Sequence, residues 1–249
     1  MKRNHIIILI GTFIILSVFQ HYIYNYKCKY SKEGMENGER KKIKNVYLIG
    51  DSIIKNDLYV SRGRSVEYYI NTLLKSKYKN DHDSSLENQP PINVTNLAVD
   101  NSDINDVYEQ IKFIPEESKD MSVIFLSVGG NDILKKYVYM YNTDFTGLTT
   151  LFNKYKELIE RIKTKFPEPE YKLVIMNIYY PPDKQTFSPF YPHIKEWNKN
   201  IESYLSKSDD NIGLIRIDEK ITDKEDFVHK IEPSELGGEK IAREIIGFL

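Results

Sequence analysis

The stretch Tyr47-Leu-Ile-Gly-Asp-Ser-Ile-Ile54 begins as an apolar run and then enters a tight turn that carries a hydroxyl group. Residues 46–49 have the length and composition of a buried strand. Gly50 and Asp51 are common turn residues, so Ser52 stands directly after the carboxyl end of that strand. A serine in this place is either an ordinary turn residue or a nucleophile, and other parts of the chain must decide between the two.

Apolar runs of strand length recur along the chain and alternate with amphipathic stretches. We expect strands at 46–49, 92–99, 122–128, 172–178 and 213–217. Apolar stripes at helical spacing predict helices within 65–74, 151–162, 194–205 and 241–246. Strands that alternate with helices indicate the α/β class, with a parallel sheet covered on both faces.

Three of the expected strands end in unusual polar residues. These ends are Gly50-Asp51-Ser52, the segment 96–102, and Gly129-Gly-Asn-Asp132. The carboxyl ends of parallel strands lie at one edge of the sheet, where ligands bind. The pattern therefore predicts a polar cluster at that edge, with Ser52 as a member.

A serine nucleophile needs a base, and histidine is the usual one. The chain has five histidines, and four of them lie in or near the N-terminal apolar run, in a polar loop or at a helix start. His229 differs, because it lies in Asp226-Phe-Val-His229 shortly before the last helix. A single loop at this point could direct an imidazole and its orienting carboxylate to the same sheet edge.

These four segments together resemble the SGNH subgroup of the GDSL hydrolases, a family of serine esterases and lipases. Gly50-Asp51-Ser52 resembles the first block of the family, 96–101 the second, Gly129-Gly-Asn-Asp132 the third and Asp226-x-x-His229 the last. The resemblance covers residues 45–249 in the order of the family. It implies a flavodoxin-like three-layer α/β/α sandwich with a five-stranded parallel sheet.

Carried over by position, the resemblance makes Ser52 the nucleophile, His229 the base and Asp226 the residue that orients it. The expected oxyanion hole consists of the side-chain amide of Asn131 and the backbone N–H groups of Ser52 and Asn101. Asn101 replaces the usual glycine of the second block, but asparagine also tolerates a left-handed backbone.

The last block departs from the family, which often has proline directly after the histidine. Here Lys230-Ile-Glu232 intervenes before Pro233. If Pro233 sets the register, Glu232 takes the position of the histidine. We prefer His229 at this stage, because a carboxylate is a poor base for a serine hydroxyl and Asp226 has the correct offset.

Composition limits the remaining function classes. The chain has 249 residues, 41% of them hydrophobic, so it can bury a core. It has 35 basic and 36 acidic residues, so it lacks the net positive charge that is typical of nucleic-acid-binding proteins. One cysteine excludes an intramolecular disulfide. Neither a metal-binding His and Cys cluster nor a Gly-rich phosphate loop occurs in the sequence, so we expect no metal and no cofactor.

The N-terminal sequence predicts that the protein associates with a membrane. An apolar run follows Lys2 and Arg3, and no small-residue cleavage site follows it. We expect an anchor or signal sequence at 1–25, a polar tether at 26–44 and the hydrolase domain at 45–249. The expectation is a single-pass signal anchor with the domain outside the cytosol, or a secreted domain if the signal is cleaved.

The expected function is serine-dependent hydrolysis of a carboxylic ester through an acyl-enzyme. The substrate would be a small-molecule, lipid or glycan ester. Two alternatives remain open: an O-acyltransferase that acts on a glycan, and a non-catalytic binding module on the same fold.

Overall fold

The computed structural model of the protein describes residues 42–80, 92–118, 120–137, 146–208 and 211–249. The segment predicted as an anchor or signal, 1–25, and most of the predicted tether lie outside these residues. Within the described ranges, no helix is both long enough and apolar enough to cross a membrane. Residues 42–249 form one compact unit.

A five-stranded parallel sheet forms the centre of this unit, in the order β2-β1-β3-β4-β5. Its strands are β1 (Ile43–Gly50), β2 (Asn93–Asn96), β3 (Met121–Ser127), β4 (Tyr171–Met176) and β5 (Gly213–Ile215). All five strands predicted from the apolar runs are present. The two edge strands are shorter than expected; β2 is only partly buried, because it has a neighbour on one side alone.

The helices predicted from apolar stripes are also present, and the structure adds shorter ones. The described α-helices are α2 (Ser52–Lys55), α3 (Val66–Asn80), α4 (Ile104–Gln110), α5 (Gly130–Tyr137), α6 (Thr146–Lys165), α7 (Lys184–Phe187), α8 (Tyr191–Lys207) and α9 (Glu235–Ile246). Short 3-10 turns cover Ile111–Phe113, Ser188–Phe190, Ile217–Glu219 and Lys224–Asp226. A two-stranded hairpin, β6 (Phe227–Val228) with β7 (Glu232–Pro233), precedes α9.

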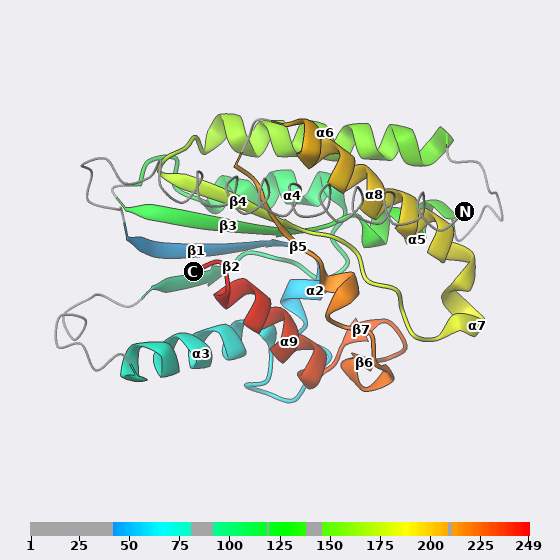
Figure 1. Ribbon diagram of the computed structural model, residues 1–249, viewed down its shortest axis with the longest axis horizontal. Helices are drawn as coiled ribbons and strands as arrows, with labels where there is room; N and C mark the ends of the chain where they lie inside the picture. The colour runs from blue at the N-terminus through cyan, green and yellow to red at the C-terminus, as the bar shows by residue number, and fades with distance from the viewer. Residues whose placement is uncertain (1–41, 81–91, 119, 138–145, 209–210) are drawn as a thin grey trace, which may run out of the picture. The chain divides into compact units, whose positions relative to one another are not determined.

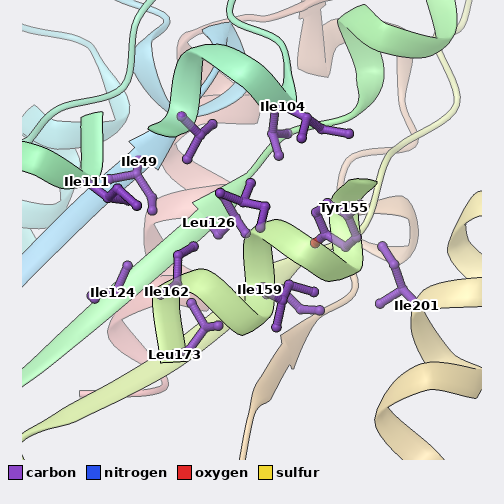
Figure 2. Close-up of a cluster of buried hydrophobic side chains, with 14 of the residues drawn as sticks. Ile49, Ile104, Ile111, Ile124, Leu126, Tyr155, Ile159, Ile162, Leu173 and Ile201 are labelled. Carbon is purple, nitrogen blue, oxygen red and sulfur yellow. The ribbon is translucent and has the colours of Figure 1, made fainter. Parts of the chain in front are cut away.

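Two hydrophobic clusters, one on each face of the sheet, make the fold a three-layer sandwich (Figure 1). Alternate residues of a strand point to opposite faces, so Tyr47 and Ile49 join one cluster while Val46 and Leu48 join the other. The first cluster is covered by α4, α5, α6 and α8, and Figure 2 shows part of it around Leu126 and Tyr155. The second is covered by α2, α3 and α9.

The chain order of the strands places a crevice at the end of β1. From β1 the chain goes to β2 on one side of it and then returns to β3 on the other side. In sheets of this order, the loops after β1 and β3 separate at a topological switch point, and ligands bind there. The residues that follow β1 and β3 are the first and third polar blocks of the sequence.

Candidate active site

The turn between β1 and α2 holds Ser52 at the carboxyl edge of the sheet. Gly50 has φ +130°, and a Cβ built there would lie 1.7 Å from the carbonyl oxygen of Ser127 on β3. Only glycine allows this approach, after which the Asp51 N–H donates to the same carbonyl at 3.0 Å. The turn is therefore fixed against β3, and Ser52 begins α2 with 7% of its surface exposed.

Asp51 stabilises this turn and does not face the solvent. Its carboxylate caps α2 by accepting the Ile53 N–H at 3.2 Å, and it accepts the Ser127 hydroxyl at 3.3 Å. Burial raises the pKa of Asp51 to about 8, although the Ile53 N–H lowers it and the charge of Glu232 raises it further. Asp51 is thus a structural acid directly beside Ser52.

Gln110 is a site residue that the sequence analysis did not identify. Its side chain accepts the Gly50 N–H at 2.6 Å and donates to the Gly50 carbonyl at 2.8 Å and to the Ser102 hydroxyl at 3.1 Å. It therefore connects the first and second polar blocks. A signal existed in the sequence: Gln110 lies three residues after the buried Val107, on the apolar face of α4, where an unpaired polar group would be costly.

The second and third blocks bring Asn101 and Asn131 to the same edge. Asn101 has φ +60°, so it adopts the left-handed backbone that the sequence analysis considered tolerable. The Asn131 side-chain amide donates to the Ser102 carbonyl at 3.0 Å, which fixes its orientation. Asp132 accepts the Ile104 N–H at 3.2 Å, and burial raises its pKa to about 6. Asp132 thereby holds α4 against the third block.

A cavity of about 360 Å³ opens beside these residues. Ser52, Asn101 and Asn131 all line it, as predicted from their positions after the strands. The rest of its wall is mainly apolar and comes from α5, the segment after β4 and the start of α8: Ile133, Leu134, Ile178, Phe187, Phe190 and Ile194. The polar cluster therefore forms one end of an apolar pocket.

The hairpin before α9 explains the stretched last block of the sequence. Val228 on β6 pairs with Glu232 on β7, and the three residues between them form a tight turn. His229 and Lys230 both have positive φ, at 49° and 73°. His229, Lys230 and Ile231 thus reverse the chain, and this turn places His229 three residues before Glu232, the residue that precedes Pro233.

In the part of the chain that the structure describes, no hydrogen bond or ion pair joins Ser52, Asp226 and His229, the three predicted catalytic residues. Asp226 is fully buried, and its carboxylate accepts hydrogen bonds from the N–H groups of Thr222 and Asp223. The same carboxylate forms an ion pair with Lys240 at 2.7 Å. His229 makes an edge contact with the ring of Tyr59, with 6.2 Å between the ring centroids. Among the described residues, neither side chain lines the cavity at Ser52, and their catalytic roles stay predictions.

Glu232 lines the cavity with Ser52, as does the preceding Ile231. Burial raises the pKa of the Glu232 carboxyl, while hydrogen bonding from the Ser52 side chain lowers it, as does the charge of His229. Glu232 is the residue that takes the histidine position if Pro233 sets the register, and it lies in the wall of the cavity at Ser52.

Sequence and structure comparisons agree with the family that the sequence resembles. The family model described as GDSL-like Lipase/Acylhydrolase matches residues 46–245, which include all four polar blocks. The chain belongs to the GDSL-like lipase/acylhydrolase family. Membership of this family makes it a hydrolase that acts on ester bonds.

Solved structures share the GDSL fold at low sequence identity. A lipolytic G-D-S-L family protein from Veillonella parvula is 20% identical, with a TM-score of 0.58, over 82% of this chain and 97% of that one. A lipase from a goat rumen metagenome is 14% identical, with a TM-score of 0.60, over 82% and 96%. An acetylxylan esterase from Geobacillus stearothermophilus is 15% identical, with a TM-score of 0.56, over 86% and 95%. A search of curated proteins gave no match.

Proposed function

We propose that the protein hydrolyses a carboxylic ester through an acyl-enzyme formed on Ser52. One observation supports this most strongly: Ser52, Asn101 and Asn131 come from three different strand ends and line the same cavity. A turn residue without a catalytic role would not require two amide-bearing residues from other strands beside it. The fold fixes each of the three by hydrogen bonds that do not involve a substrate.

The oxyanion of the tetrahedral intermediate would lie between Ser52, Asn101 and Asn131. The Asn131 amide has two N–H groups; one donates to the Ser102 carbonyl, and the second can donate to the oxyanion. The backbone N–H groups of Ser52 and Asn101 supply the other donors. Because Gly50 and Asn101 have positive φ, the backbone at both positions is set before any substrate binds.

The wall of the cavity favours an ester with an apolar group near the scissile bond. Phe187, Phe190 and Ile194 form one side of the pocket, and Ile133 and Leu134 form another. A volume of about 360 Å³ is at the small end of the range for ligand sites, so we expect a small acyl or alkyl group. The goat rumen protein is a lipase and the Geobacillus protein an acetylxylan esterase, and both substrate classes contain carboxylic esters.

The test is hydrolysis of a short p-nitrophenyl ester by the wild type and by Ser52→Ala. We expect Ser52→Ala to lose almost all turnover, and the exposed Ser61→Ala to match the wild type. Ser52→Ala with wild-type turnover would exclude the proposed mechanism. Analysis of the products with a sugar acceptor present would identify a transferase, since an acylated sugar would then replace the free acid.

A further inference from the structure

The Ser52 hydroxyl has a carboxylate as its neighbour in the cavity. Ser52 is the first residue of α2, Glu232 is the first residue of β7, and these two elements pack against each other. Both side chains line the cavity, and Ser52 lowers the pKa of the Glu232 carboxyl as a hydrogen-bond donor, against the larger effect of burial. One carboxylate oxygen of Glu232, Oε2, is buried and accepts no hydrogen bond from the described residues. The carboxylate therefore shares the cavity with Ser52, and no described group donates to its buried oxygen.

The backbone on both sides of Glu232 is fixed to the walls of the site. The carbonyl of Ile231 accepts the hydroxyl of the buried Tyr179 at 2.7 Å. The carbonyl of Pro233 lies 3.5 Å from the side-chain amide of Asn56, the residue that caps the end of α2. The same Asn56 side chain accepts the Val66 N–H at 2.8 Å. These contacts position Glu232 relative to the helix that begins with the nucleophile.

We propose that Glu232 is the general base of this enzyme and takes the proton of Ser52 during acyl transfer. This inference rests on the proposed function and assigns the base to the residue before Pro233. His229, in the turn of the hairpin, then contributes charge near Glu232 and does not contact the reacting atoms.

Each proton in this mechanism has a defined donor and acceptor. As the Ser52 oxygen bonds to the ester carbonyl carbon, its proton moves to Glu232 and the carbonyl electron pair moves to the oxyanion. The intermediate then collapses, the bond to the alkoxy oxygen breaks, and the Glu232 carboxylic acid protonates the leaving alcohol. Water attacks the acyl-enzyme and gives its proton to Glu232, which returns it to Ser52 as the free acid leaves.

A carboxylate is a weak base in water, but this one is partly buried. Burial raises the pKa of Glu232, which brings its basicity closer to that of an imidazole. Glu232 accepts the Ser52 proton and later returns it within the same cavity, so the mechanism requires no second base. The ionisable groups that face Glu232 from neighbouring elements are Asp51, Asp100, His229, Tyr59 and Tyr179.

The first experiment compares three single variants on the same short p-nitrophenyl ester. Glu232→Gln keeps the shape of the side chain and removes the base, so we expect kcat to fall by about 10²–10⁴-fold. His229→Gln should lower kcat by less than about tenfold, because a neighbouring charge contributes less than the base itself. Glu239→Gln, which affects only an exposed ion pair with Arg243, is the matched control. If His229→Gln loses as much activity as expected for Glu232→Gln, or if Glu232→Gln keeps wild-type kcat, the assignment is wrong.

A second variant separates a chemical role from a structural one. Glu232→His puts an imidazole directly before Pro233, so it should recover activity relative to Glu232→Gln. The acid limb of its kcat/KM profile should then follow the imidazole, with a pKa near its ordinary value of about 6.5. A purely structural glutamate predicts no recovery and no shift of the acid limb, and that result would overturn the proposal.

Labelling with a fluorophosphonate distinguishes failure of this inference from failure of the proposed function. If the wild type is not labelled, Ser52 is not an activated nucleophile and the proposed function itself fails. If the wild type is labelled and Glu232→Gln is labelled at the same rate, Ser52 is the nucleophile but Glu232 is not its base. We expect labelling of the wild type and labelling at least about tenfold slower for Glu232→Gln.

Discussion

Asp226 gives the sharpest test between the triad predicted from the sequence and the arrangement in the structure. In the triad, it would orient His229 and its loss would reduce catalysis. In the structure, its carboxylate accepts the N–H groups of Thr222 and Asp223 at 3.0 and 3.1 Å and pairs with Lys240. Its own carbonyl accepts the Ser234 N–H at 2.8 Å. Asp226 therefore connects the loop before the hairpin to the start of α9.

The magnitude of the effect of Asp226→Ala follows from these contacts. Removing one partner of a buried ion pair costs about 3–5 kcal/mol. The side chain of Lys240 is 31% exposed, so the released ammonium group is solvated and its share of this cost is small. The two backbone N–H groups lose a charged acceptor, at about 1.5–3 kcal/mol each. Both hydrogen bonds are only partly buried, so we use the lower end of this range and expect the free energy of unfolding to fall by about 3 kcal/mol in total.

The assay is urea denaturation followed by circular dichroism, with ester hydrolysis measured on the same samples without urea. With a slope of about 2–3 kcal/mol per molar urea, the midpoint should fall by about 1 M. The kcat of the folded variant should fall by less than about tenfold, because Asp226 does not contact the reacting atoms. Glu225→Ala removes an exposed neighbouring carboxylate and should change neither quantity. An unchanged midpoint together with a loss of kcat of about 10³-fold would show that Asp226 acts as the third member of a catalytic triad.

Two further predictions concern the oxyanion hole and the buried acid beside it. Asn131→Ala should lower kcat by about 10²–10³-fold, which corresponds to about 3 kcal/mol of activation barrier, with little change in KM. Steady-state kinetics measures both constants, and a rise in KM with unchanged kcat would contradict the role of Asn131. Asp51→Asn should stabilise the protein more at pH 8 than at pH 5 in chemical denaturation. Burial raises the pKa of Asp51 from 3.8 to about 8, so between these pH values the folded state retains a proton that the unfolded state releases. The stability of the wild type therefore falls as the pH rises from about 4 to about 8. Equal pH dependence in both proteins would refute this account of Asp51.

The sequence predicts the three central strands well because each contains a run of apolar residues that the sheet buries. The runs at β1 and β3 are almost fully buried, and the polar residues directly after them line the cavity. The positions of Ser52 and Asn131 could be predicted for the same reason: they follow strand ends, and all ends of a parallel sheet lie at one edge. The spatial order of the strands could not be predicted, since it depends on long-range packing.

The base was harder to predict, because two registers fit the last block. Asp226-x-x-His229 has the spacing of a triad, and Glu232 has the position before Pro233. The hairpin that separates them contains His229 and Lys230 at positive φ, with no glycine to mark the turn. A turn made of such residues has no clear sequence signal. The sequence therefore favoured the familiar spacing, while the structure places Glu232 beside Ser52.

The most direct test of the whole account is the site of covalent modification. The protein is incubated with a fluorophosphonate, digested and analysed by peptide mass spectrometry, with Ser52→Ala treated in parallel. A single adduct on Ser52 in the wild type, and none in Ser52→Ala, is the predicted result. Hydrolysis of the ester without any adduct on Ser52, or an adduct on another residue, would contradict the proposal that Ser52 is the nucleophile.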